Sequence, residues 1–146
     1  MQTQLANRTV VVTGASGGIG RALANVFAAE QANLVLTGHR QADDLRAYVA
    51  DQPWADRALV VAADVVDPEQ MATALQQGVE RFGRIDVCVA NAGVWPKENL
   101  LLHELTVDRI RQTLEVNLLG ATWTAHAFLR ALAETGPREG EGASLT

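Results

Sequence analysis

The sequence has 146 residues, enough for one domain with a substantial core, and its composition of 48% hydrophobic and 20% charged residues is typical of globular proteins. The formal net charge of -5 leaves no basic surplus to replace the counterions of a phosphate backbone, which argues against nucleic acid as the main partner. A single cysteine excludes an internal disulfide and a cysteine-rich metal site. Without a signal-like start or an apolar stretch of about 20 residues, we expect a cytoplasmic protein that does not contact a membrane.

Short β-branched runs alternate with longer segments of helical spacing along the chain. The helix that follows Asp67 has clear end signals, with Pro68 at its first position and Gly83 beyond its last. A Gly/Glu-rich loop is expected over 138–142, and 143–146 look like the opening of a fifth strand. The other expected strands are 8–13, 33–37, 58–63 and 85–90, and the expected helices are 20–30, 42–51, about 67–82 and about 106–134. This alternation predicts right-handed βαβ units, and therefore an α/β fold with a doubly wound parallel sheet.

A glycine-rich turn joins the first strand to the first helix. Gly14 permits a tight turn at positive φ, and side-chain-free positions further along would let a phosphate group approach the backbone and the helix N-terminus. A P-loop is excluded, because Ile19 stands where that motif needs its second glycine and no lysine is near. The alternative is a turn in which the glycines have no binding role. Their loss of backbone entropy on folding would then have no compensating benefit. The expected phosphate-binding residues are Gly14, Ala15, Ser16, Gly17, Gly18, Ile19 and Gly20.

This turn, with Thr13 before it, resembles the Thr-Gly-x-x-x-Gly-x-Gly signature of the short-chain dehydrogenase/reductase family. Its spacing also fits the Gly-x-x-Gly-x-x-Gly version found in the extended branch of that family. The segment from Ala90 to Gly93 is similar to the family's Asn-Asn-Ala-Gly and favours the one-domain branch, although Ala90 replaces the first Asn. The resemblance implies that Asn91 bridges the central strands, and that Ala92 and Gly93 let the cofactor ribose pass closely.

Two further positions carry the resemblance. It implies that Asp64 and Val65, after the third strand, bind the adenine edge, although an acidic residue there can also simply cap a turn. Asn117 lies in the long helix among Leu114, Leu118 and Ala121, where an Asn is often a hydrogen-bonded core residue. Because its surroundings are similar to the family's Val-Asn-x-x-Gly, the resemblance implies a catalytic role: Asn117 would kink the helix and hold a water of the proton relay.

The end of the second strand indicates which cofactor is used. NAD-dependent relatives usually place an Asp where Gly38 stands here, and His39 and Arg40 follow it. Since arginine suits a phosphate, we expect NADP(H) to be preferred, with NAD(H) possible. Arg40 could equally be a solvated loop charge, and Arg21 is a second candidate for the 2'-phosphate.

The family's Ser and Tyr-x-x-x-Lys are missing from the sequence. Its one tyrosine is Tyr48, in the second helix, and its one lysine is Lys97. His103 and His126 show no metal-ligand spacing, so no metal site is expected. We therefore expect residues 1–146 to be a Rossmann-like dinucleotide-binding domain, incomplete at the C-terminus and truncated after the start of strand five.

The resemblance implies an NAD(P)-dependent oxidoreductase acting on a small-molecule carbonyl or alcohol, with this chain as a fragment. A non-catalytic NADP(H)-binding module or a truncated pseudoenzyme is the alternative, and a relic that folds poorly is a third hypothesis. Homo-oligomers are expected through the long helix, by resemblance alone.

Overall fold

The fold is a five-stranded parallel sheet with helices on both faces, which confirms the predicted fold class. The computed structural model describes residues 4–95, 100–136 and 142–146. The strand order is β3-β2-β1-β4-β5, so the chain winds outward from β1 in one direction and then returns to wind in the other. The strands are β1 (Thr9–Val12), β2 (Asn33–Gly38), β3 (Ala58–Ala62), β4 (Val87–Val89) and β5 (Ser144–Leu145).

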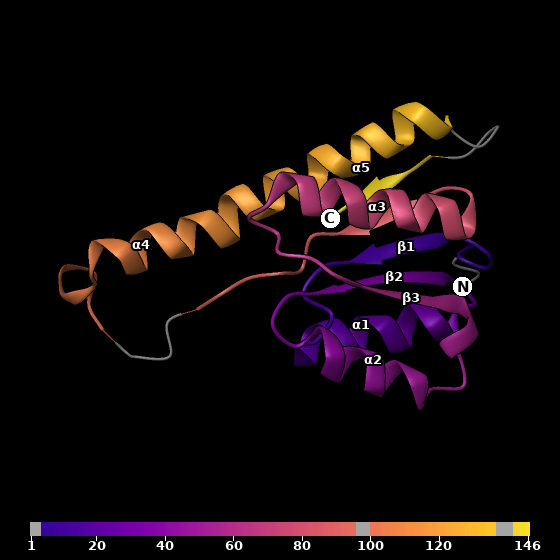
Figure 1. Ribbon diagram of the computed structural model, residues 1–146, viewed down its shortest axis with the longest axis horizontal. Helices are drawn as coiled ribbons and strands as arrows, with labels where there is room; N and C mark the ends of the chain where they lie inside the picture. The colour runs from indigo at the N-terminus through magenta and orange to yellow at the C-terminus, as the bar shows by residue number, and fades with distance from the viewer. Residues whose placement is uncertain (1–3, 96–99, 137–141) are drawn as a thin grey trace.

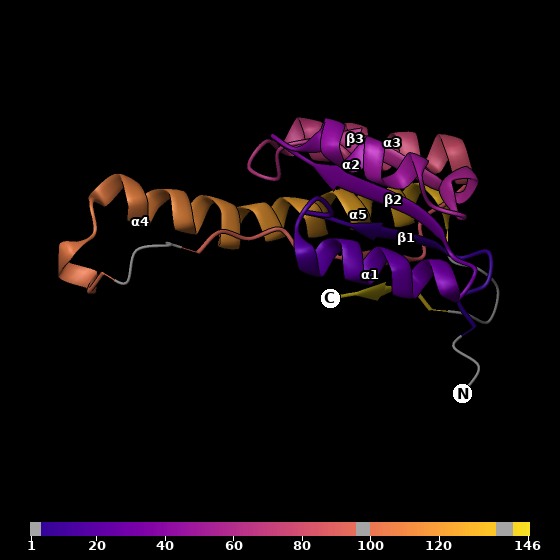
Figure 2. The same ribbon diagram turned by 90° about the horizontal axis from the view of Figure 1, so that it is seen from below.

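Four helices cover the sheet, two on each face. Figures 1 and 2 show α1 (Gly18–Ala29) and α2 (Ala42–Ala50) on one face, and α3 (Pro68–Phe82) and α5 (Ala121–Thr135) on the other. The signals read at the ends of α3 are confirmed: Asp67 Oδ1 accepts hydrogen bonds from two amides of the first turn, and Gly83 adopts φ +83°. The chain also forms two short 3-10 turns, η1 (Ala55–Arg57) and η2 (Leu102–Glu104).

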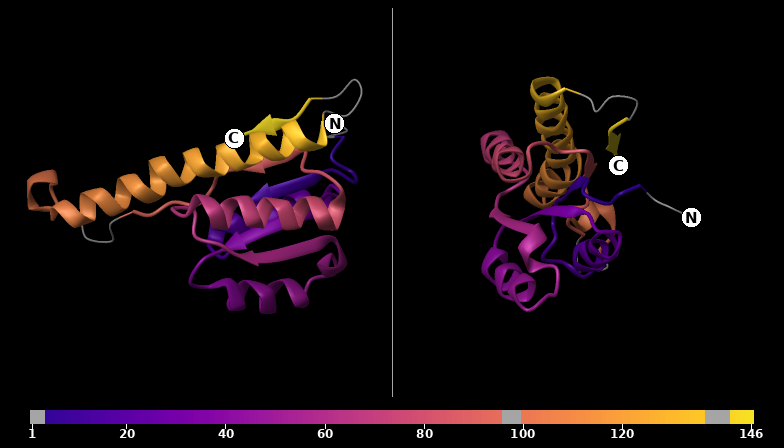
Figure 3. Two further views of the ribbon diagram at one scale, coloured as in Figure 1. Left: turned by 45° about the horizontal axis from the view of Figure 1, so that its top comes forward. Right: turned by 90° about the vertical axis from the view of Figure 1, so that its right-hand side faces the viewer.

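The predicted long helix is continuous but not uniform. It consists of α4 (Val107–Leu114), the π-helical segment η3 (Glu115–Gly120) and α5. Thr106 caps its start by accepting a hydrogen bond from the Arg109 amide (3.2 Å). Figure 3 shows that α4 projects beyond the carboxyl ends of the strands, away from the body of the sheet. We call this projection, residues 100–120, the arm.

The core lies on both faces of the central strand, as a continuous apolar run predicts for a parallel sheet. Val11 packs with Cys88 and Phe128 on one face, whereas Val10 and Val12 pack under α1 and α2 on the other. Cys88 is fully buried, and burial raises the pKa of its thiol to about 12.

Two alanines of α1 form its buried face, and Leu23 and Phe27 are only partly buried against the same core. Val26 is 61% exposed, and the helix instead buries Ala24 and Ala28 against the sheet. Small residues on this face let α1 lie close to β1, and the larger apolar side chains of the helix are less buried.

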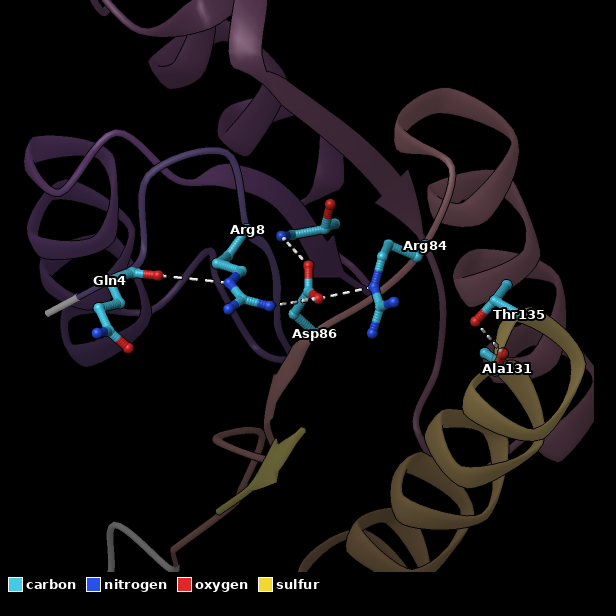
Figure 4. A network of polar contacts seen from close by, with 7 residues as sticks. Gln4, Arg8, Arg84, Asp86, Ala131 and Thr135 are labelled. Atoms are coloured by element: carbon cyan, nitrogen blue, oxygen red, sulfur yellow. Dashed lines mark hydrogen bonds and ion pairs between the residues drawn. The ribbon is translucent and has the colours of Figure 1, made fainter. Parts of the chain in front are cut away.

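The amino end of the sheet holds a buried charged cluster around Asp86, which is 2% exposed (Figure 4). Asp86 Oδ1 lies 3.3 Å from Nη1 of Arg8 and 2.7 Å from Nε of Arg84. Its Oδ2 accepts a hydrogen bond from the Thr9 amide (2.9 Å). These contacts tie β1 to the segment that enters β4.

Within the described ranges, no helix combines the length and the apolar character that a membrane span requires. Lys97 and all but the last residue of the expected loop 138–142 lie outside the described residues.

Candidate functional site

The glycine-rich turn lies at the carboxyl end of β1. At two of its glycines, any side chain would collide with neighbouring backbone atoms. Gly14 adopts φ +63°, and a Cβ there would lie 2.8 Å from the Cα of Ala92. At Gly20 a Cβ would lie 2.5 Å from the Cα of Ala15. The turn is therefore packed against both β4 and the start of α1, which brings backbone rather than side chains to this edge of the sheet.

The N-terminus of α1 is open. Gly17 is the cap residue and offers no side chain to the first helical amides, those of Gly18, Ile19 and Gly20. These amides have no carbonyl partner inside the helix, and the helix dipole adds positive potential beside them. A Cβ at Gly18 would meet nothing within 4 Å. The arrangement can hold an anionic group against the backbone.

The end of β4 is tied to the turn by side-chain hydrogen bonds. Asn91 Nδ2 donates to the carbonyl of Thr13 (2.9 Å), and the Ala92 amide donates to Thr13 Oγ1 (3.0 Å). Thr13 is buried and was not among the expected site residues, although it stands first in the turn motif. Asn91 thus bridges the central strands, and the segment 91–93 is fixed next to Gly14.

The ends of β2 and β3 meet through their side chains. His39 Nδ1 lies 3.3 Å from Asp64 Oδ2, and Asp64 Oδ1 accepts a hydrogen bond from the Val66 amide (3.2 Å). Gly38, which precedes His39, is buried, and a Cβ there would come within 3.5 Å of Ser16 Oγ. Because position 38 has no side chain, His39 and Arg40 are the side chains that the end of β2 contributes to this edge of the sheet.

Asn117 lies in η3, the last part of the arm before α5. Its Oδ1 accepts a hydrogen bond from the Val94 amide (2.8 Å), and its Nδ2 donates to the Val94 carbonyl (2.9 Å). The alternative of a core position for Asn117 is wrong, because Asn117 is exposed and its helical neighbours Leu114 and Leu118 are 53% and 59% exposed. These leucines belong to the arm, which does not lie on the sheet. Instead, Asn117 fastens the segment after β4 to the helix.

These elements enclose a cavity of about 700 Å³ at the carboxyl edge of the sheet. Most of the expected site residues line it, whereas Ala15, Gly38 and Asn117 do not. Ala15 and Gly38 are buried behind its wall, and Asn117 reaches only its rim through Val94. The cavity is also lined by residues that the sequence did not single out: Gln41, Ala63, Val66, Val94, Gln112, Glu115 and Val116.

A model of the short chain dehydrogenase family matches residues 8–142, almost the whole chain. The chain belongs to this family. Among its relatives is an L-rhamnose 1-dehydrogenase (NAD(P)(+)) of Sphingomonas sp. (strain SKA58), which is 36% identical over 142 residues. That match covers 97% of this chain and 54% of the relative. The cis-4-hydroxycyclohexanecarboxylate dehydrogenase of Sinomonas cyclohexanicum is also 36% identical, over 93% of this chain and 54% of its own length.

Solved structures of short-chain dehydrogenases superpose closely on the fold. A glucose/ribitol dehydrogenase from Brucella melitensis matches with a TM-score of 0.82 and 34% identity, over 90% of this chain and 54% of that one. A 3-ketoacyl-(acyl-carrier-protein) reductase from the same organism, solved with NADH, gives a TM-score of 0.85 at 25% identity, over 97% and 57%. The chain spans about half the length of the relatives it matches.

Arg21, the second candidate for a phosphate contact, does not line the cavity of this family member. Its guanidinium carbon lies 4.6 Å from the ring centroid of Tyr48, in a cation–π contact between α1 and α2. Arg21 therefore lies between the two helices and not at the cavity.

A second cavity, of about 460 Å³, lies between α3 and α5, away from the glycine-rich turn. Among the residues that the structure describes, no three His, Cys, Asp or Glu side chains group in a way that could hold a metal ion.

Proposed function

We propose that this chain forms the cofactor-binding part of an NAD(P)-dependent oxidoreductase that transfers hydride between a nicotinamide and a small-molecule carbonyl or alcohol. The single observation that carries the proposal is the open cavity at the carboxyl edge of the sheet, with the uncapped N-terminus of α1 at its wall. A pyrophosphate fits there, because Gly18 leaves open space and the first helical amides have no partners within the helix.

The two ends of the cavity suit the two ends of a dinucleotide. In this proposal Asp64 and Val65 hold the adenine, whereas Asn91, Ala92 and Gly93 lie beside the ribose of the nicotinamide half. Asn117 holds the segment after β4 through both polar atoms of the Val94 backbone, and its proposed catalytic role is to order a water of the proton relay there. The nicotinamide would accept or supply the hydride.

NADP(H) is the preferred cofactor in this proposal, with NAD(H) accepted. His39 and Arg40 line the cavity directly after β2, and no carboxylate stands at Gly38 to repel a 2'-phosphate. The NAD(P)(+) designation of the L-rhamnose 1-dehydrogenase relative supports the use of both cofactors.

The position of Tyr48 favours a second candidate, a nucleotide-binding module without turnover of its own. Tyr48 is the only tyrosine in the sequence, and its hydroxyl accepts a hydrogen bond from Asn25 Nδ2 (2.8 Å) between α1 and α2. It does not line the cavity, so no phenol of this chain is available there as a proton donor. Turnover by the chain alone is therefore expected to be weak or absent.

Titration of the purified chain with NADPH and NADH, followed by cofactor fluorescence, tests the binding proposal. We expect saturable binding of both, tighter for NADPH. Absence of saturable binding for either cofactor would refute the proposal. Carbonyl-dependent oxidation of NADPH by the chain would exclude the second candidate, because a binding module shows none, whereas its absence is expected of both candidates.

Gly18→Ala separates cofactor binding from folding. The new methyl group would enter open space, so the thermal midpoint should stay the same or rise slightly, since alanine limits the unfolded chain. The same methyl would obstruct a pyrophosphate, and we expect binding to weaken about tenfold, which corresponds to about 1.4 kcal/mol. Gly142→Ala is the matched control, because its methyl also meets nothing within 4 Å but lies outside the cavity.

A further inference from the structure

His39 and Asp64 meet at the cavity wall, at the ends of two neighbouring strands. The His39 Nδ1 atom lies 3.3 Å from Asp64 Oδ2. Both residues line the cavity, and the His39 side chain is 55% exposed. One nitrogen of the imidazole therefore lies beside a carboxylate at ion-pair distance, while more than half of the His39 side chain stays exposed to a ligand.

Asp64 is itself fixed by α3. Its backbone amide donates to Gln70 Oε1 (3.0 Å), and Gln70 Nε2 donates to Asp67 Oδ2 (2.8 Å). Hydrogen bonds from the backbone and side chain of Gln70 hold the pKa of Asp67 below its usual value, so this cap is a stable anion. The carboxylate of Asp64 thus has a defined place, and it can act as a positioning residue for His39.

A histidine held in this way offers different hydrogen-bonding groups in its two protonation states. A carboxylate facing Nδ1 favours the tautomer with hydrogen on Nδ1, which leaves Nε2 as an acceptor for a hydroxyl. When the ring is protonated, Nε2 becomes a donor with positive charge, which suits a phosphate oxygen. Histidine changes between these states within the physiological pH range.

Few other charges share the cavity with His39. Its remaining titratable residues are Arg40, which follows His39, and Glu115, which comes from η3. The glycine-rich turn contributes none, and Arg21 of α1 is stacked on Tyr48. Arg40 keeps its positive charge at every pH considered, so it attracts the phosphate but does not switch.

We propose that His39, positioned by Asp64, selects between the 2'-hydroxyl of NAD and the 2'-phosphate of NADP according to its own protonation. This inference rests on the proposed cofactor site. The chain would accept either cofactor, and its preference for NADP would increase as the pH falls.

Calorimetric titration with NADP+ and NAD+ between pH 6 and 8 tests the proposal. We expect the ratio of the NAD+ Kd to the NADP+ Kd to fall at least about fivefold from pH 6 to pH 8, because a charged hydrogen bond is replaced by a weaker one. Titrations at pH 7 in buffers of different ionisation enthalpy should show proton uptake on binding NADP+ and little on binding NAD+.

His39→Gln is the matched control, because glutamine keeps hydrogen-bonding groups but has no charge to gain. The 2'-phosphate itself titrates near pH 6, so this variant should show a ratio that is flat or rises with pH. Asp64→Asn should weaken both cofactors through the adenine contact, and it should also flatten the pH dependence of the ratio. The flattened pH dependence would show that Asp64 positions His39, because a loss of adenine binding alone would weaken both cofactors equally and leave the pH dependence of the ratio unchanged.

The possible failures can be told apart. If the wild-type chain binds neither cofactor, the proposed function is refuted and this inference with it. If the chain binds both cofactors with a ratio that does not fall with pH, or if His39→Gln behaves like the wild type, the switch alone is refuted and the proposed function stands.

Discussion

The two ends of the parallel sheet place acidic and basic residues next to each other, but in different surroundings. At the amino end Asp86 is 2% exposed and contacts Arg8, Arg84 and the Thr9 amide. At the carboxyl end the Asp64 side chain is 24% exposed, and its partner His39 is 55% exposed. The amino-end cluster is closed, whereas the carboxyl-end pair faces a cavity of about 700 Å³.

This difference separates stability from binding. A buried carboxylate with several partners has no capacity left for a ligand, and the loss of one partner leaves uncompensated charge in the interior. The half-exposed pair contributes little to stability, but its accessible groups can change partners when a ligand arrives. Variants at the two ends should therefore affect different measurements.

The largest expected effect comes from Asp86→Asn at the amino end. Two arginines would lose their anion, and removing one member of a buried ion pair costs about 3–5 kcal/mol of folding free energy. Urea unfolding measures this loss. The Cys88 thiol gives an independent readout: because burial raises its pKa to about 12, alkylation at pH 8 should be negligible until the chain unfolds.

Asp43→Asn serves as the control for this prediction. Asp43 also pairs with an arginine, Arg46 (2.6 Å), but its side chain is 97% exposed, so we expect almost unchanged stability. Equal losses of stability in the two variants would contradict the distinction between buried and exposed pairs. Cofactor affinity of the folded Asp86→Asn protein should stay within about twofold of wild type, since the cluster lies at the far end of the sheet.

An intermediate effect is expected for Gly14→Ala at the carboxyl end. A non-glycine residue in the left-handed region costs about 1–3 kcal/mol, and the new Cβ would also collide with Ala92. The turn would have to move, so cofactor binding should weaken more than tenfold. Gly83→Ala is the matched control: its φ is +83°, but nothing lies within 4 Å of an added Cβ, and it should lower stability while leaving binding intact.

Much of the fold could be predicted because its signals are local. Short β-branched runs predicted the strands, of which β1 is fully buried, and Asp67, Pro68 and Gly83 predicted both ends of α3. The helical spacing predicted α1 as a helix, but it did not show that Ala24 and Ala28 would be the residues buried against the sheet. Which residues of α1 are buried depends on how closely the helix approaches the turn. Gly20 permits that close approach, because a Cβ there would lie only 2.5 Å from Ala15 Cα.

The site could be predicted as a set of residues, but not as a set of contacts. The turn motif and the strand ends indicated most of the cavity wall, because the carboxyl ends of parallel strands meet at one edge. The contact between His39 and Asp64 depends on the side-by-side placement of β2 and β3 and on side-chain direction. The resemblance around Asn117 implied an irregular helix there, where the structure has a π-helical segment, but the contact of Asn117 with Val94, 23 residues away, has no signal in local sequence.

Asn117→Ala has the smallest expected effect on stability and a specific local one. It removes two hydrogen bonds to Val94, each contributing about 0.5–1.5 kcal/mol when protected, and less here because water reaches the exposed amide. Global stability should therefore change by no more than about 1 kcal/mol. The amide of Val94, no longer held, should exchange its hydrogen more than tenfold faster, as measured by NMR.

Asn117→Asp tests the two bonds separately. The carboxylate keeps an acceptor for the Val94 amide but loses the donor to the Val94 carbonyl, so hydrogen exchange at Val94 should lie between wild type and Asn117→Ala. Unchanged exchange in the alanine variant would show that the segment after β4 is held by its bonds to Thr13 alone. In that case the rim of the cavity would be independent of the arm, and Asn117 would act on a ligand directly or not at all.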